Sequence, residues 1–249
     1  MSLEEHRFMR TEALIGTEGL NKIKNSTVMI VGLGAVGGYS VEALARSGVG
    51  KMILVDFDTV DLTNINRQIY ALTSTIGEDK YKLAKKRVKD INPDCEVVAK
   101  KIFVNTDTID EIINMKPDYV IDAIDTLNPK CCLIQALVEN NIKFISSMGA
   151  ALRTDPTFIQ IGNLNQTKNC NLSRLIRKRM KKREVDMTKV RCVFSTEKMD
   201  NLPENAIMEN KTEAQLPGRI RNIIGSMPTI TAIFGLTIAN HVIWDILKD

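Results

Sequence analysis

A glycine-rich turn between a short apolar run and a helical stretch constrains this chain more than any other feature. Val28–Val31 is an apolar run that Gly32 ends, a length and pattern that predict a buried strand. Residues 32–37 form the turn and have the spacing G-x-G-x-x-G. The candidate nucleotide-binding residues in it are Gly32, Gly34, Ala35 and Gly37. In such a turn one glycine permits the bend, one lets a phosphate approach the backbone, and one lets the following helix pack on the strand. The N–H groups at the start of that helix would bind the phosphate.

A second strand, predicted over residues 51–55, ends at Asp56, 19 residues after Gly37. A carboxylate at this point of a βαβ unit reaches the ribose hydroxyls of a nucleotide. Together with the turn, Asp56 therefore favours a nucleotide-binding unit over a glycine-rich turn of purely structural use.

The residues that follow favour ATP over a dinucleotide. An NAD enzyme needs little positive side-chain charge, because backbone donors satisfy a diphosphate. Arg67 and Lys80 would supply the extra cations that a triphosphate requires. A lone arginine or lysine is more often an ordinary surface residue, but both lie just beyond the carboxyl end of the second strand, where open α/β sheets bind ligands.

Strand and helix patterns alternate as far as residue 150, which predicts a Rossmann-like, doubly wound α/β fold with a mainly parallel sheet. Residues 157–161 alternate polar and apolar side chains and predict an antiparallel extension of that sheet. The helix expected after Pro228 is apolar on more than one face, so we expect it to be buried. We predict one domain over residues 1–249, with a nucleotide-binding half (1–150) and a substrate and dimer half (151–249).

A carboxylate follows another predicted strand, at residues 119–123. Asp125 would face the same crevice as the glycine turn and is a natural ligand for the Mg²⁺ that bridges phosphates. The alternative is that Asp125 only caps the next helix.

Residues 174–183 hold seven basic residues and no acidic one, and the other 27 basic residues of the chain are outnumbered by 30 acidic residues. A focused basic patch attracts polyanions, although most charge runs are only solvated faces. No aromatic residue is interleaved, so contact with phosphates is the expected mode. The candidate nucleic-acid-binding residues are Arg174, Arg177, Lys178, Lys181 and Lys182.

None of the five cysteines forms a C-x-x-C pair, so we expect no zinc site. The polar N-terminus lacks a secretory pattern. The longest apolar stretch, residues 230–246, is shorter than the roughly 20 residues of a membrane span. We therefore expect a cytoplasmic protein with no membrane contact.

Several motifs together resemble the ThiF/MoeB/HesA superfamily, relatives of ubiquitin-activating enzymes that adenylate carboxylates with ATP. They are the glycine turn, Val55-Asp56-Phe57-Asp58, Asn64-x-Asn66-Arg67-Gln68, Lys80, Ile91-Asn92-Pro93 and Asp122-Ala-Ile-Asp125. Further segments are closest to the branch that dehydrates threonylcarbamoyladenosine in tRNA. They are Asp155-Pro-Thr, Cys192-Val-Phe-Ser-Thr-Glu and Ala232-x-Phe-Gly followed by His241.

The resemblance implies ATP and Mg²⁺ as cofactors, tRNA as substrate, a homodimer and a possible cysteine-desulfurase or other sulfur-transfer partner. It implies that Asp125 binds Mg²⁺, that Arg67 and Lys80 hold pyrophosphate and that Asn64 and Asn66 orient phosphates or metal. Asp58 and Gln68 join this implied ATP-binding set. Arg10 would reach the partner's ATP across the dimer or remain a solvated helix residue, and residues 198–222 would form a mobile loop near the substrate.

Three alternatives remain at this point. An adenylating enzyme for a ubiquitin-like sulfur carrier shares the same first half-reaction, but that branch commonly carries C-x-x-C pairs. An NAD-dependent oxidoreductase would not need Arg67, Lys80 and Asp125, and a non-catalytic scaffold would need no ATP pocket. Cys192 could act as a nucleophile, although a small buried strand residue is the simpler interpretation, and His241 is more simply a hydrogen-bonded core histidine than a catalyst.

Overall fold

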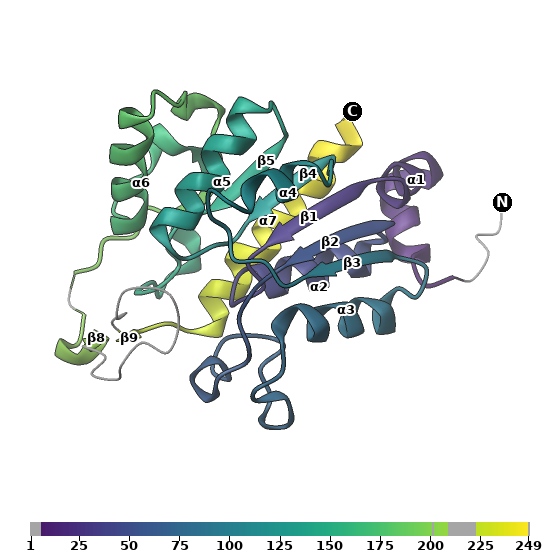
Figure 1. Cartoon of the computed structure of the whole chain (residues 1–249). Helices are drawn as coiled ribbons and strands as arrows, with labels where there is room; N and C mark the ends of the chain where they lie inside the picture. Colours follow the sequence, from purple (N-terminus) through teal and green to yellow (C-terminus); the bar gives the residue numbers. More distant parts are fainter. Residues whose placement is uncertain (1–5, 201, 209–222, 249) are drawn as a thin grey trace.

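The computed structural model describes residues 6–200, 202–208 and 223–248. A seven-stranded sheet in the order β3-β2-β1-β4-β5-β7-β6 forms the centre of the molecule (Figure 1). All neighbouring strands are parallel except β6 and β7. The strands are β1 (Thr27–Val31), β2 (Lys51–Val55), β3 (Glu96–Lys100), β4 (Tyr119–Asp122), β5 (Phe144–Ser147), β6 (Ile159–Asn163) and β7 (Arg191–Ser195). This topology confirms the predicted doubly wound α/β fold and its antiparallel extension.

Helices cover both faces of the sheet. They are α1 (Met9–Lys24, kinked at Gly16), α2 (Gly37–Ser47), α3 (Lys80–Ile91), α4 (Ile109–Ile113), α5 (Leu127–Glu139), α6 (Asn171–Lys182) and α7 (Pro228–Lys248). The order of the strands reverses between β1 and β4, and in open α/β sheets the crevice at such a point binds ligands at the carboxyl ends of the strands. The fold therefore places the glycine turn, which follows β1, at the expected site.

Strand β1 shows why the first apolar run is continuous. Val28 and Ile30 pack into the core on the side of α2 and α7. Met29 and Val31 pack into the second core, on the side of α5 and α6. Because successive strand residues point to opposite faces, a strand covered on both sides needs apolar residues at every position.

Helix α7 packs closely against α2. The Ser40 hydroxyl donates to the Gly235 carbonyl over 2.9 Å, and a Cβ at Gly235 would lie 2.4 Å from the Val36 carbonyl oxygen. The helix buries one face, whereas Leu236 and Trp244 on its other side are 46% and 44% exposed. The prediction of a buried C-terminal helix thus holds for one face.

By length and composition, α7 is the one helix in the described part of the chain that could cross a membrane. It has 21 residues, and 44% of its apolar window is buried within the fold. The helix extends beyond the apolar residues 230–246, but the buried core helix of a globular protein passes the same test of length and composition, so this finding does not contradict the expectation of no membrane contact.

A second, two-stranded antiparallel sheet lies apart from the first. It pairs β8 (Ile207–Met208) with β9 (Ile223–Ile224), which the sequence did not predict. These strands are formed by residues on either side of 209–222. The predicted mobile loop over residues 198–222 lies largely outside the described residues.

Candidate active site

The glycine turn has the conformation that its three glycines predict. Gly32 has a φ of +91°, and a Cβ there would lie 2.8 Å from the Ala123 carbonyl oxygen. A Cβ at Gly37 would lie 1.8 Å from the Gly32 carbonyl oxygen, so no larger residue fits without moving the turn. At Gly34 the nearest atom to a Cβ would be Nε2 of Gln68, at 3.6 Å. A Cβ at Gly34 would thus make only ordinary van der Waals contact with the flexible Gln68 side chain, so a phosphate could approach the backbone there once that side chain moves.

Asp56 links the end of β2 to this turn. Its carboxylate accepts hydrogen bonds from the Leu33 N–H over 2.6 Å and from the Asp58 N–H over 2.8 Å. The residue is 7% exposed. Burial raises the pKa of the Asp56 carboxyl, and the positive charge of Lys80 limits that rise. The carboxylate predicted to bind ribose therefore also helps to hold the glycine turn in place.

Lys80 is the first residue of α3 and is only 5% exposed. Its Nζ lies 3.3 Å from Oδ2 of Asp58, longer than a typical charge-assisted hydrogen bond. A lysine with so little exposure needs an anionic partner. The structure thus brings Lys80, Asp56 and Asp58 together at the carboxyl end of β2, as the sequence predicts.

The segment that carries Arg67 is a tight loop. Asn64 is 9% exposed and accepts a hydrogen bond from the Asp61 N–H over 3.2 Å, which closes a capping box. Arg67 donates through Nη1 to the Thr63 carbonyl and to Oδ1 of Asn66, over 2.8 and 2.9 Å. These contacts show Asn64 anchoring the loop and Asn66 orienting the guanidinium, roles that the sequence alone did not distinguish.

Asn66 also ties this loop to the C-terminal half of the chain. Its Nδ2 donates to the Ser226 carbonyl over 3.0 Å. Ser226 lies between β9 and α7, so the loop that carries Arg67 contacts the segment that leads into the apolar helix.

A buried ion pair supports the end of β4, and the sequence analysis missed it. Lys130 and Asp122 are both fully buried, with Nζ 2.8 Å from Oδ2. The same Nζ donates to the Ile124 carbonyl over 3.0 Å. Ser146 Oγ donates to Oδ2 of Asp122, and the Ile124 N–H donates to Oδ1. The sequence signal for this pair was a single lysine among the mainly apolar residues that form α5.

Asp125 follows directly after this anchored turn and is exposed. Its Oδ1 accepts a hydrogen bond from the Thr126 hydroxyl over 3.3 Å. Because the oxygens of Asp122 are engaged inside the protein, Asp125 is the carboxylate of this motif that a metal in solution could reach.

The structure separates the basic residues of α6 into two groups. Exposed side chains on the outer face are Arg174, Lys178, Lys181 and Lys182. Arg177 is half-buried and donates to the carbonyl and hydroxyl of Thr167 and to Ser173. Arg179 donates to Asn128 at the start of α5. Arg183, just after the helix, donates to the Cys131 carbonyl and to Gln135 on α5. Arg177, Arg179 and Arg183 thus help to anchor the helix, and the other four basic residues form its outer basic surface.

Two sequence candidates are not near a reactive environment. Cys192 is fully buried on β7, and burial raises the pKa of its thiol to about 12. His241 is half-buried on α7, and burial lowers the pKa of its imidazole. Cys192 therefore lacks the low thiol pKa and the exposure that a nucleophile requires.

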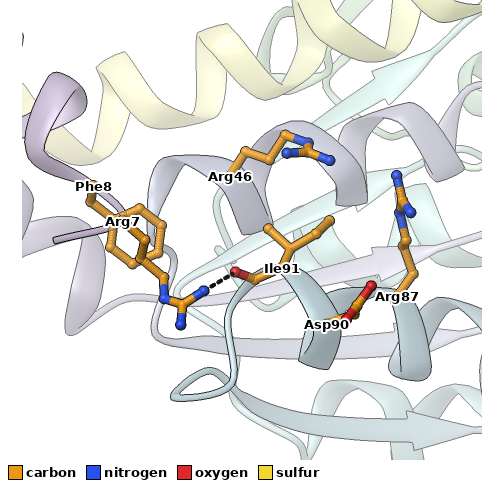
Figure 2. A pocket seen from close by; sticks show the side chains of 6 residues that line it. All are labelled: Arg7, Phe8, Arg46, Arg87, Asp90 and Ile91. Atoms are coloured by element: carbon orange, nitrogen blue, oxygen red, sulfur yellow. Dashed lines mark hydrogen bonds between the residues drawn. The ribbon is translucent and has the colours of Figure 1, made fainter.

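Arg10 lies on α1, which leads directly into the amino end of β1 and so lies at the opposite end of the sheet from the glycine turn (Figure 1). At that end a hollow of about 350 Å³ lies between α1, α2 and α3. Its lining includes Arg7, which donates to the Ile91 carbonyl over 3.0 Å, and Arg46 and Arg87 (Figure 2). Within one chain the structure does not bring Arg10 to the nucleotide site.

Comparison with known proteins places this geometry in a family. The model of the ThiF family matches residues 8–249. The chain belongs to the ThiF family. The tRNA threonylcarbamoyladenosine dehydratase of Bacillus subtilis is 41% identical over 244 residues, covering 98% of this chain and 96% of the relative. The Escherichia coli enzyme of the same name is 35% identical, covering 94% and 91%.

A solved structure of a ThiF-family relative agrees with these matches. The E. coli tRNA N6-threonylcarbamoyladenosine dehydratase TcdA, in complex with ATP, has a TM-score of 0.85 and 33% identity. The match covers 97% of this chain and 94% of that chain.

In the described part of this chain, no group of three or more histidine, cysteine, aspartate or glutamate side chains could hold a metal ion.

Proposed function

We propose that this chain is an ATP-dependent tRNA threonylcarbamoyladenosine dehydratase that adenylates the threonylcarbamoyl carboxylate and cyclises it with loss of water. The observation that carries the proposal is similarity to dehydratases of that name along nearly the whole chain. The glycine turn at the switch point of the sheet supports it, because that turn supplies the phosphate-binding site the reaction needs.

The nucleotide site has distinct parts for ribose and phosphates. Asp56 holds the ribose, while the backbone around Gly34 and Ala35 and the start of α2 face the α-phosphate. Arg67 and Lys80 bind the pyrophosphate that leaves. Asn66 positions the Arg67 guanidinium, and Asp58 balances the charge of Lys80 before the nucleotide binds. Gln68, beside Gly34, completes the ATP-binding set.

The exposed carboxylate of Asp125 fits a Mg²⁺ that also binds the phosphates, because Mg²⁺ in nucleotide sites usually takes one or two carboxylates, phosphate oxygens and water. Bound there, Mg²⁺ would neutralise part of the phosphate charge. We expect no zinc, because the sequence has no C-x-x-C pair.

The reaction proceeds in two steps. A carboxylate oxygen of the threonylcarbamoyl group attacks the α-phosphorus, and the bond from that phosphorus to the bridging oxygen of pyrophosphate breaks. Arg67 and Lys80 stabilise the charge that builds up on the leaving group. The carbamoyl group then attacks the activated acyl carbon and loses a proton, while AMP leaves with one former carboxylate oxygen. No enzyme nucleophile takes part, which agrees with the burial of Cys192.

The outer face of α6, with Arg174, Lys178, Lys181 and Lys182, contacts the phosphates of the tRNA. Arg177 contributes by holding the helix to Thr167. These lysines and arginines supply attraction that does not depend on sequence, so selection of the modified nucleoside is left to the site itself.

A homodimer completes the proposal. The exposed apolar face of α7, with Leu236 and Trp244, is the surface that a second copy covers. Arg10 then reaches the partner's ATP, since it does not reach the site of its own chain. We place the enzyme in the cytoplasm, where its tRNA substrate occurs, and a cysteine desulfurase or other sulfur-transfer protein is a possible further partner.

The test is to incubate the protein with ATP, Mg²⁺ and tRNA carrying threonylcarbamoyladenosine, and then to digest the tRNA and weigh the nucleoside. The expected result is an ATP-dependent loss of the mass of one water, which an Arg67→Ala variant does not produce. An unchanged nucleoside from a protein that binds ATP would overturn the proposal and favour a ubiquitin-like carrier as the substrate.

A further inference from the structure

Helix α3 carries a second basic surface that the proposed site does not use. From Lys80 to Lys89 the helix has six basic residues and no acidic one. Lys80 is buried at the nucleotide site, and Arg87 donates to Glu42 on α2. The other four side chains are exposed and are Lys82, Lys85, Lys86 and Lys89. Their spacing of i, i+3, i+4 and i+7 puts them on one face of the helix, here called the lysine stripe.

Neighbouring carboxylates neutralise little of this charge. Asp79 pairs with Lys82 over 2.7 Å and also with Lys101. Lys89 donates to the Pro93 carbonyl, which carries no formal charge. Lys85 and Lys86 have no hydrogen-bond or ion-pair partner within the described ranges. At least the middle of the stripe therefore presents uncompensated positive charge to the solvent.

The distribution of charge over the chain makes this stripe stand out. Helix α3 and residues 174–183 together hold 13 of the 34 basic residues and one acidic residue, Asp90, so the rest of the chain has 21 basic and 29 acidic residues. A protein that is acidic elsewhere and basic on two helices focuses its attraction for polyanions on those helices.

The position of the stripe relates it to the reaction. It starts beside Lys80, at the carboxyl edge of the sheet, and follows α3 to the arginine-lined hollow at the other end of the helix (Figure 2). With a rise of 1.5 Å per residue, Lys82 and Lys89 are about 10 Å apart along the axis. A track of this length that leads away from the site suits an extended polyanion better than a small anion.

We propose that the lysine stripe of α3 binds the sugar–phosphate backbone of the substrate tRNA, as a second contact in addition to α6. This inference rests on the proposed function, since it assigns the substrate of that same site to a further surface. Lysine binds phosphate as a point charge and without reading bases. The stripe would thus hold the backbone near the modified nucleoside while that nucleoside occupies the site beside Lys80.

The test compares two double variants that each remove two exposed positive charges. Lys85→Gln/Lys86→Gln changes the stripe, and Lys116→Gln/Lys143→Gln changes exposed lysines on loops outside α3 and α6. Binding of threonylcarbamoyladenosine-containing tRNA is measured by titration at several salt concentrations, without ATP. Each variant is also checked for an unchanged rise in melting temperature with ATP, which shows that the fold and nucleotide site are intact.

For the stripe variant, which loses two contacts, we expect the steepness of log affinity against log salt to fall by about 1.4 to 1.8, since each phosphate contact contributes about 0.7 to 0.9. At about 0.15 M salt, that loss corresponds to roughly fifteen- to thirtyfold weaker binding. The control variant should stay within about twofold of the wild type, because charges away from the contact act only at long range and are screened by salt.

Three results would overturn the inference, and they differ from one another. If the wild type binds and dehydrates tRNA but the stripe variant keeps its affinity and slope, the inference alone fails, and an acidic protein becomes the better partner for α3. Equal losses in both variants would show a general effect of net charge. If the wild type neither binds nor converts the tRNA, the proposed function fails and this inference with it.

Discussion

The buried ion pair behind the β4 turn makes the strongest quantitative prediction. Lys130→Met removes the ammonium group but keeps a long apolar side chain in the same space. It leaves Asp122 with no exposure to solvent and without its 2.8 Å partner. The change also removes the donor to the Ile124 carbonyl, which lies next to Asp125 in the chain.

Removing one partner of a buried pair costs about 3–5 kcal/mol, because the remaining charge is neither solvated nor paired. Both side chains here are fully buried, so solvent does little to lessen the loss. For a chain of this size each kcal/mol lowers the melting temperature by about 2–4 °C. We therefore expect Lys130→Met to melt roughly 6–20 °C below the wild type.

The double variant Asp122→Asn/Lys130→Met separates charge from packing. An asparagine at position 122 can still accept from the Ile124 N–H and contact the Ser146 hydroxyl, which the aspartate now binds. Because no uncompensated charge remains, the double variant should recover most of the lost free energy of unfolding.

The assay is urea unfolding of the wild type, both single variants and the double variant, followed by circular dichroism. The reasoning would be refuted if a single variant lost less than about 1 kcal/mol of the free energy of unfolding. It would also be refuted if the double variant were less stable than both single variants. Leu137→Ala, a buried change two turns along the same helix, is a control that lowers stability without touching the β4 turn.

Three further predictions concern the site. Arg67→Ala should abolish turnover while keeping the melting temperature within about 2 °C, since its guanidinium contacts only its own loop; retained turnover would refute its role. Cys192→Ser should keep turnover, and at pH 8 Cys192 of the native protein should resist iodoacetamide, because a pKa of about 12 keeps the thiol protonated; rapid labelling of Cys192 would contradict its burial. Gly34→Ala should keep stability but lose the rise in melting temperature with ATP, whereas Gly37→Ala should lose both, because its Cβ would lie 1.8 Å from the Gly32 oxygen; equal behaviour of the two would argue against the assigned turn.

The fold could be predicted from the sequence because its signals are local. The apolar run of β1, the glycine turn and the strand ending at Asp56 each lie within a few residues of one another. Their roles depend on backbone geometry that glycine spacing and strand period fix. Arg67, Lys80 and Asp125 could be proposed for the same reason, since each follows the carboxyl end of a predicted strand.

The ion pair between Lys130 and Asp122 could not be predicted, because it joins a helix to a strand end through the tertiary fold. The same holds for α6. The sequence located the basic run of residues 174–183, but only the fold shows that Arg177 and Arg179 turn inward to Thr167 and Asn128. The pairing of β8 with β9 joins short segments on either side of residues 209–222, so no local pattern announced it.

The central claim is that ATP activates the threonylcarbamoyl carboxylate as an acyl-adenylate. The most direct measurement labels both oxygens of that carboxylate with a heavy oxygen isotope, and then analyses the nucleotide products by mass spectrometry after one turnover. The account predicts AMP that carries one heavy oxygen, together with unlabelled pyrophosphate. Two results would contradict adenylation of the carboxylate. One is the production of ADP together with labelled inorganic phosphate, and the other is the production of AMP without the label.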